Sequence, residues 1–332
     1  MRKIKIAQIG TSKNSHGNQI WNSLIKQRDI FEICGYAMPE NEKEKFPERM
    51  EKFKGYPELT VDEIMKNPEI EAVVIETEEI YLTKYALLAA KHKKHIHMEK
   101  PGSTVLSDFE KLIETVKKNK TVFHMGYMYR YNPYIIVLKE KIKKGDLGDV
   151  ISVEAQMNCF HNDEVRMWLK NLPGGMMFFL GCHLIDLIYS IQGEPLDIIS
   201  LSCSTGINGI DTNDYGMVVM KYKNGVSFAQ TNCIQLGGFA RRNLTVTGTK
   251  ATVELCPLEM VADEGMIFTE KTEYTSEVWA DRGTKTQCGP FDRYDSMMAG
   301  FAAYVRTDKE NPWDYDYELN LHKIVMKACG EI

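Results

Sequence analysis

The first third of the chain alternates short apolar runs with segments whose apolar residues recur every three or four positions. The apolar runs, each typical of a buried strand, occupy residues 4–9, 31–38, 72–75, 96–98 and 122–125. Helical spacing marks residues 20–25, 85–90 and 109–116 between them. Strands that alternate with helices in this way predict an α/β domain with a Rossmann-like, doubly wound parallel sheet over residues 1–125.

Two capping signatures predict where helices of this domain begin. Thr60 is followed three residues later by Glu63, and Ser107 is followed by Glu110 in the same way. In such a capping box the hydroxyl oxygen accepts a hydrogen bond from a first-turn amide, and the glutamate accepts one from the amide of the capping residue. We therefore expect helices to start directly after Thr60 and Ser107.

Residues 126–332 have the pattern of an α+β domain. Asn132–Pro133 is typical of a helix start, and that helix is expected to run to Lys144. Further strands are predicted at residues 150–157, 198–203, 217–222, 226–232, 244–247 and 252–255, and helices at 176–191, 296–305 and 317–329. Because Asn224–Gly225 is a strong hairpin signal, we expect a large, mostly antiparallel sheet. The last helix, stopped by Gly330, is a candidate to pack back on the first domain.

Length and composition agree with two globular domains. Of the 332 residues, 43% are hydrophobic and 26% are charged, which is typical of a soluble protein. Lys and Arg total 41 against 46 Asp and Glu, so the net charge of −5 gives no electrostatic reason to bind nucleic acid. No apolar run reaches the roughly 20 residues that cross a bilayer, and no secretory leader is visible. Eight scattered cysteines without a C-x-x-C pair predict neither a disulfide framework nor a metal site, so we expect a cytoplasmic protein.

The turn between the first strand and the first helix is a candidate dinucleotide loop. A Rossmann fingerprint has the form G-x-G-x-x-G, in which glycines let the backbone approach a pyrophosphate at the helix N-terminus. Gly10 occupies the first glycine position, whereas Ser12 and Ser15 occupy the second and third. Thr11 and Asn14 complete the loop, whose small polar residues still leave room for an anion. An ordinary structural turn is an equal alternative for such a segment.

The positions that would hold the ribose and the pyrophosphate depart further from the fingerprint. The acid expected at the end of the second strand, which would bind the ribose hydroxyls, is replaced by Met38, and Glu40 is only a possible substitute. The third strand ends at Thr77 among three glutamates, whose charge would oppose a pyrophosphate. Lys13 and His16 offset part of that charge. The sequence therefore weakens the case for a cofactor without excluding it.

Three later segments carry a specific resemblance to a known family. Glu99-Lys100-Pro101 follows a strand of the Rossmann-like domain, and residues 126–133 enter the second domain. Gly174-Gly175 then precedes residues 181–186, Gly-Cys-His-Leu-Ile-Asp. In this order the segments resemble signatures of the Gfo/Idh/MocA oxidoreductases, the last being similar to the family's D-x-G-x-H-x-x-D helix. The resemblance covers essentially the whole chain, and it implies hydride transfer between NAD or NADP and a sugar, polyol or related secondary alcohol.

The resemblance also implies roles for individual residues. Lys100 would hold or polarise the reacting oxygen, and His183 would be the acid/base, because imidazole titrates nearest neutrality. Asp186 would contact substrate hydroxyls, and Arg130 would approach the cofactor or substrate from the interdomain side. The expected cofactor-binding residues are Gly10, Thr11, Ser12, Asn14, Ser15, Met38, Thr77, Glu99, Lys100 and Arg130. Trp168 and Asn158 are weaker candidates for lining a sugar pocket.

Purely structural roles are the alternative for each of these residues. Lys100 could be an ordinary solvated lysine, His183 a satisfied core histidine, and Asp186 a structural residue. The family's first aspartate aligns with Phe179, which cannot relay a proton or orient imidazole. Either Lys100 and His183 suffice, or the reaction is altered, or catalysis is lost.

Two other functions therefore stay open beside the dehydrogenase. One is a non-redox carbohydrate-binding or accessory protein that has lost turnover. The other is a glycoside-cleaving enzyme that retains its cofactor and oxidises its substrate transiently. By analogy with the family, we expect a homodimer or homotetramer in each case.

Overall fold

The computed structural model describes residues 2–332, and these form two compact units. The first unit contains residues 2–127 and 294–322, and the second contains residues 128–293 and 323–332. Residues 294–322, which the sequence pattern placed in the second domain, thus belong to the first unit. Within residues 2–332, no helix combines the length and the apolar composition that a membrane crossing requires.

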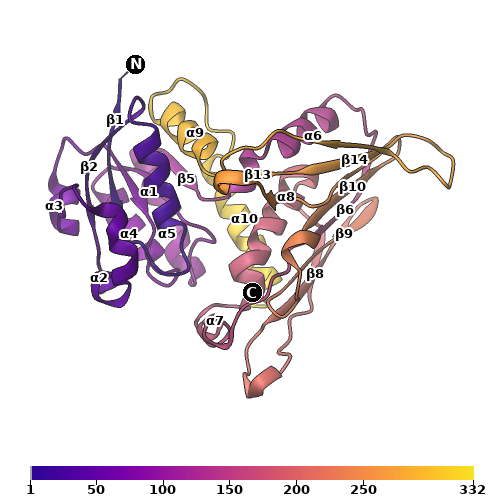
Figure 1. Cartoon of the computed structure of the whole chain (residues 1–332), viewed down its shortest axis with the longest axis horizontal. Helices are drawn as coiled ribbons and strands as arrows, with labels where there is room; N and C mark the ends of the chain where they lie inside the picture. Colours follow the sequence, from indigo (N-terminus) through magenta and orange to yellow (C-terminus); the bar gives the residue numbers. More distant parts are fainter. Residues whose placement is uncertain (1) are drawn as a thin grey trace. The chain divides into compact units, whose positions relative to one another are not determined.

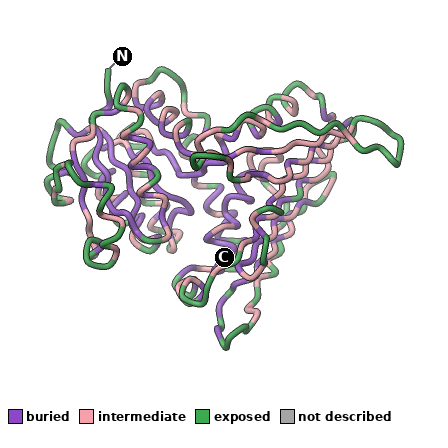
Figure 2. The backbone as a smooth tube through the Cα atoms, viewed as in Figure 1, coloured by how far each residue is buried: buried purple, intermediate pink, exposed green. Residues whose placement is uncertain are grey.

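The first unit is built on a parallel sheet, which confirms the predicted Rossmann-like domain (Figure 1). Its strand order is β2–β1–β3–β4–β5. The strands are β1 (Ile4–Ile9), β2 (Phe31–Ala37), β3 (Ala72–Ile75), β4 (His95–Met98) and β5 (Phe123–Met125). Every residue of β3 is buried, and Figure 2 shows most of this sheet in the colour of buried chain. A strand covered on both faces needs consecutive apolar residues, which is why β3 shows no alternation.

Helices pack around this sheet. They are α1 (Gly17–Lys26), α2 (Glu42–Lys45), the 3-10 segment η1 (Pro47–Phe53), α3 (Val61–Lys66), α4 (Leu82–Lys91), α5 (Leu106–Asn119), α9 (Asp295–Val305) and α10 (Tyr315–Ala328), whose last residues belong to the second unit. α9 joins α1 through the Ser23 hydroxyl, which donates to Asp295 Oδ1 at 2.7 Å. This contact ties residues 294–322 to the start of the chain.

One of the two predicted capping boxes is present. Thr60 Oγ1 accepts the Glu63 N–H at 3.1 Å, and Glu63 Oε2 accepts the Thr60 N–H at 2.7 Å, so the first box is confirmed. The second box is wrong, because α5 already begins at Leu106 and its N-cap is Val105. There the Ser103 hydroxyl accepts the Val105 N–H at 3.1 Å, so the chain has turned into the helix before it reaches the predicted cap.

The second unit is an α+β domain, as predicted, with an eight-stranded sheet in the order β15–β14–β11–β10–β6–β9–β8–β7. β6 and β9 pair in parallel, and the other neighbours pair antiparallel. The strands are β6 (Val150–Gln156), β7 (Asp197–Ser200), β8 (Tyr215–Tyr222), β9 (Gly225–Asn232), β10 (Asn243–Gly248), β11 (Thr252–Leu255), β14 (Glu270–Tyr274) and β15 (Thr284–Gln287). A separate hairpin pairs β12 (Met260–Val261) with β13 (Ile267–Phe268).

Three helices complete the second unit. They are α6 (Pro133–Lys143), α7 (Asp163–Trp168) and α8 (Cys182–Gln192), the last entered through a π-helical turn at Met177–Gly181. The N-cap at Asn132 is confirmed, because its side chain accepts the N–H groups of Tyr134 and Ile135. α8 packs against β6 and β9, which places its buried residues over the middle of the sheet.

The second unit differs from the sequence prediction in several places, including α7 and the β12–β13 hairpin, which were not predicted. The predicted strand at 198–203 is shorter, since β7 ends at Ser200 and Cys203 pairs with Tyr215 only as an isolated bridge. β14 and β15 were not predicted, because they read Glu-Lys-Thr-Glu-Tyr and Thr-Lys-Thr-Gln and bury no full apolar face. Strands without an apolar face leave no period-two pattern to recognise.

A buried ion pair between Arg166 and Asp214 links α7 to the start of β8, and we expect its removal to destabilise the fold. Arg166 Nη2 and Nε donate to Asp214 Oδ2 at 2.7 and 3.1 Å, and both side chains are almost fully buried. Asp214→Ala would leave that guanidinium buried without its carboxylate, so it should lower the free energy of unfolding by about 3–5 kcal/mol. Asp163, which is 49% exposed, also contacts Arg166. Asp163→Ala is the control and should lower the free energy of unfolding by about 1 kcal/mol or less. Both variants are measured by urea denaturation. Equal losses of unfolding free energy in the two variants would show that burial adds nothing to the Arg166–Asp214 pair.

Candidate functional site

The β1–α1 loop presses closely on the end of β3. Gly10 has a φ of +85°, and a Cβ atom at this position would lie 2.6 Å from the Thr77 backbone nitrogen. The Ser12 N–H donates to the Glu76 carbonyl at 3.0 Å, which ties the loop to the same segment. Thr11, Ser12 and Thr77 are buried. The first glycine of the fingerprint is therefore required by the backbone, and four predicted residues, Gly10, Thr11, Ser12 and Thr77, lie together.

The rest of the loop lies at the start of α1. Ser15 is buried, Asn14 is partly exposed, and the Ser15 N–H donates to the Ser12 carbonyl at 3.1 Å. Arg49, from η1, braces this segment with bonds from Nε to Thr11 Oγ1 at 3.2 Å and from Nη2 to the Ser15 carbonyl at 3.3 Å. Sequence reasoning missed Arg49, because only tertiary packing brings it to the loop.

A carboxyl group does lie beside the loop, but it belongs to neither of the two positions that the sequence suggested, Met38 and Glu40. Met38 follows β2 and is partly exposed, and Glu40 binds Lys84 and the Tyr85 hydroxyl on α4. Glu42, at the start of α2, accepts the Thr11 N–H through Oε2 at 2.6 Å and is 2% exposed. The only hint in the sequence is Asn41, which tolerates the left-handed backbone that turns the chain back toward the loop.

Two glutamates after β3 are buried acids. Glu76 and Glu79 are at most 1% exposed, and their carboxyl oxygens receive no hydrogen bond from residues 2–332. Burial raises the pKa of Glu79 to about 8 and lifts that of Glu76 well above its ordinary value. Glu79 is therefore mostly neutral near pH 7, and burial disfavours the charged form of Glu76 as well. The charge that the sequence places here is accordingly much reduced.

Glu99 and Lys100 follow β4 at the carboxyl end of the sheet, the edge at which doubly wound folds bind ligands. Glu99 and Lys100 are each 1% exposed, and Lys100 Nζ lies 3.5 Å from Glu99 Oε1. His16 Nδ1 lies 3.1 Å from both oxygens of Glu99. Burial works to raise the pKa of Glu99, but His16 and Lys100 outweigh it and leave the pKa below its ordinary value. The Lys100–Pro101 bond is cis.

In the second unit, His183 is fixed by an aromatic neighbour. It lies in the first turn of α8, is 1% exposed, and meets the Tyr129 ring edge-on with centroids 5.2 Å apart. The Tyr129 hydroxyl donates to the buried carboxylate of Glu259. Arg242 and Arg293 bind the same carboxylate, at 2.5 and 2.6 Å. Sequence reasoning missed this network, whose members come from distant segments.

Arg130 and Asp186 bind one another. Arg130 Nε lies 3.1 and 3.0 Å from the two Asp186 oxygens, and Nη2 lies 2.8 Å from Oδ1. Both residues are buried, with Arg130 4% and Asp186 1% exposed. The pair anchors the entry of the second unit to α8, and the roles assigned to these residues toward cofactor and substrate stay predictions.

Phe179 lies in an aromatic cluster, which we define as Phe179, Trp168 and His161. Trp168 meets the Phe179 ring edge-on with centroids 5.1 Å apart, and the centroid of the His161 ring lies 6.2 Å from that of Phe179. Asn158 is fully buried, and its amide donates to Gln235 Oε1 at 2.7 Å. Phe179, which stands where the resemblance implies an aspartate, thus lies among aromatic rings.

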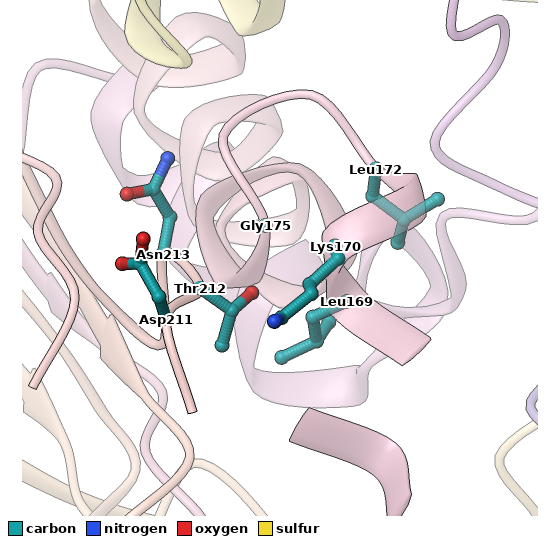
Figure 3. A pocket seen from close by; sticks show the side chains of 7 residues that line it. All are labelled: Leu169, Lys170, Leu172, Gly175, Asp211, Thr212 and Asn213. Carbon is teal, nitrogen blue, oxygen red and sulfur yellow. The ribbon is translucent and has the colours of Figure 1, made fainter. Parts of the chain in front are cut away.

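A pocket of about 340 Å³ is lined in part by residues that directly follow Trp168 in the sequence (Figure 3). Its lining residues are Leu169, Lys170, Leu172, Gly175, Asp211, Thr212 and Asn213. None of the residues predicted to act in catalysis or binding lines it. Among residues 2–332, no three His, Cys, Asp or Glu side chains gather as metal ligands.

Family models match both units. Residues 4–127 match the model of the oxidoreductase family with an NAD-binding Rossmann fold, and residues 135–254 match the GFO/IDH/MocA C-terminal domain. A myo-inositol 2-dehydrogenase of Thermotoga maritima is 24% identical over 259 residues, which cover 74% of this chain and 72% of the relative. A glucose-6-phosphate 3-dehydrogenase of Bacillus subtilis is 25% identical over 230 residues, covering 67% and 63% of the two chains.

Solved structures share the fold over nearly the whole chain. The aldose–aldose oxidoreductase of Caulobacter crescentus superposes with a TM-score of 0.81 at 17% identity, covering 99% of this chain and 98% of that one. A 3-ketoreductase of Actinomadura kijaniata, solved in complex with NADP, gives a TM-score of 0.80 at 13% identity and covers 98% and 96%. At these identities the likeness concerns the fold.

The surroundings of the β1–α1 loop fit the dinucleotide that the first family model describes. Gly10 keeps the close backbone approach, Glu42 supplies an acid beside the loop, and burial disfavours the charged forms of Glu76 and Glu79. The expectation of NAD or NADP is confirmed by the match of residues 4–127 to an NAD-binding fold.

The buried acid Glu79 predicts a pH-dependent stability. Between about pH 4.5 and 8 the folded protein holds a proton that the unfolded chain has released, so stability falls as pH rises through this window. Glu79→Gln cannot ionise and should raise the melting temperature of the nucleotide-free protein by about 5 °C at about pH 8.5, with little change near pH 4.5. Glu114→Gln, on the exposed face of α5, is the control for scanning fluorimetry. A pH-independent effect of Glu79→Gln would refute the neutral state of Glu79.

Proposed function

The chain belongs to the Gfo/Idh/MocA family of NAD-binding oxidoreductases, and from this premise we propose that it transfers hydride between NAD or NADP and a sugar, polyol or related secondary alcohol. The observation that carries the proposal is Lys100, a buried amine at the carboxyl end of β4, where a doubly wound fold binds ligands. The names of the inositol and glucose-6-phosphate dehydrogenases support the substrate class.

The reaction needs one group that stabilises the substrate oxygen and one that moves its proton. The nicotinamide supplies the hydride chemistry when it is bound. Lys100 Nζ donates a hydrogen bond to the substrate oxygen, which stabilises the negative charge that develops there during oxidation. A ring nitrogen of His183 takes the hydroxyl proton as the C=O bond forms, and it returns that proton in the reverse direction. Glu99, paired with His16, lies beside Lys100 and orients its amine.

The aromatic cluster determines the kind of surface that a substrate would meet. Phe179 brings no carboxylate to this position, so no acid there shares a proton with His183. Trp168 and Phe179 instead present rings of the kind that pack against the C–H face of a sugar. In this proposal Lys100 stabilises the charge on the substrate oxygen and His183 moves its proton, whereas the aromatic cluster contributes only a packing surface for the substrate.

Release of a bound nucleotide tests the proposed class directly. The purified chain is denatured, the supernatant is assayed for nicotinamide nucleotide, and melting curves are recorded with NAD and with NADP. A nucleotide present at 100-fold excess over its dissociation constant should stabilise the native chain by about 2.7 kcal/mol. Neither release nor stabilisation would favour the carbohydrate-binding accessory protein, for which the exchange of aspartate for Phe179 is the supporting observation.

Substitutions of the two assigned residues test the mechanism. Lys100→Met and His183→Ala should each lower kcat about 100-fold or more, because each removes an interaction with the reacting oxygen or its proton. Activity is followed by nicotinamide absorbance over a panel of sugars and polyols. Lys91→Met and His92→Ala, both on the exposed end of α4, are matched controls and should leave kcat unchanged. Retained activity in both Lys100→Met and His183→Ala would remove these assignments.

A further inference from the structure

Glu42 holds the place beside the β1–α1 loop where a Rossmann fold uses an acid. In that fold an Asp or Glu near the end of the second strand accepts hydrogen bonds from the adenosine ribose, next to the loop backbone. Here the strand ends at Ala37, and Met38 has no charge. Glu40 and Asn41 then both adopt left-handed backbone, with φ of 58° and 57°, and the chain turns so that Glu42 points back at the loop.

The contacts of Glu42 leave one oxygen for a ligand. Oε2 accepts the Thr11 N–H at 2.6 Å, whereas Oε1 is buried and has no hydrogen-bond partner among residues 2–332. A buried carboxyl oxygen without a donor is costly, and a ligand hydroxyl would supply the missing donor. Burial raises the pKa of Glu42 to about 7, although the Thr11 N–H that Oε2 accepts and the nearby Glu78 N–H work to lower it. A further donor at Oε1 would favour the ionised carboxylate.

We propose that Glu42 binds the hydroxyls of the adenosine ribose and thereby makes the chain prefer NAD to NADP. This inference rests on the proposed dinucleotide chemistry. NAD offers hydroxyl donors at this position, and a carboxyl oxygen accepts them. NADP carries a 2′-phosphate there, which has no proton to give at neutral pH and repels an ionised carboxylate.

Arg49 is the group that would favour NADP, since an arginine near the ribose accommodates a 2′-phosphate in some Rossmann folds. Its donors already bind the loop, at Thr11 Oγ1 and at the carbonyls of Lys13 and Ser15. Binding a phosphate would break these bonds, which brace the loop. Arg49 therefore acts as a support for the loop, and Glu42 sets the preference.

Titration calorimetry on the nucleotide-free full chain tests the proposal with NAD and NADP as separate ligands. The wild-type chain should bind NAD at least about tenfold more tightly than NADP. Glu42→Gln keeps an oxygen for the Thr11 N–H but loses the charge, so it should weaken NAD about tenfold and bring the two dissociation constants within about threefold. Glu42→Asp, which keeps the charge on a shorter side chain, should retain the preference. Glu40→Gln is the matched control and should behave as wild type, because Glu40 binds α4 instead.

The outcomes separate this inference from the proposed function. If neither nucleotide binds the wild-type chain or any variant, the proposed function fails and the inference fails with it. If both nucleotides bind wild type equally, or NADP binds more tightly, only the assignment to Glu42 is overturned. Tighter binding of both nucleotides by Glu42→Gln would also overturn it, because Glu42 would then obstruct the site. Melting temperatures near wild type show that the variants remain folded.

Discussion

The close approach of β1 to β3 at their carboxyl ends is the constraint on which the first unit's site depends. Gly10 must lack a side chain because any Cβ would meet the Thr77 backbone, and its φ of +85° turns the chain toward α1. That turn presents the Thr11 N–H to Glu42 and the Ser12 N–H to the Glu76 carbonyl. Gly10 thus determines the path of the loop. Ser12 and Ser15, at the other two glycine positions of the fingerprint, carry side chains and could not make this close approach.

Burial, more than residue type, decides the charge at this end of the sheet. Glu76 and Glu79 are acids by sequence, but their carboxyl oxygens receive no hydrogen bond from residues 2–332, and burial raises the pKa of both. Glu99 is equally buried and remains ionised, because His16 and Lys100 lie beside it. The charge of Glu99 thus lies beside the buried amine of Lys100, whereas burial disfavours the charged forms of Glu76 and Glu79. A dinucleotide pyrophosphate meets far less repulsion than a count of carboxylates implies.

The sequence predicted the architecture well because the buried elements carry strong periodic signals. The run of residues 72–75 and the hairpin at Asn224–Gly225 are examples, and both are present. Elements held by polar contacts gave no such signal, as β14 and β15 show. The capping box at Ser107 failed because Ser103 closes the turn first. Glu42 could not be predicted, since its position depends on a left-handed turn and on the distant Thr11 amide.

In the second unit, Phe179 stands where the resemblance to the family implies an aspartate, four residues before His183. A carboxylate can orient imidazole through a hydrogen bond, whereas Phe179 packs with Trp168 and gives no direction to a proton. The Tyr129 ring stands edge-on to His183, and Tyr129 is itself anchored through Glu259 to two arginines. Because Glu259 is fully buried and its charge is balanced by these arginines, the anchor is rigid and costly to break. Edge-on packing against this anchored ring therefore helps to hold the imidazole of His183 in place.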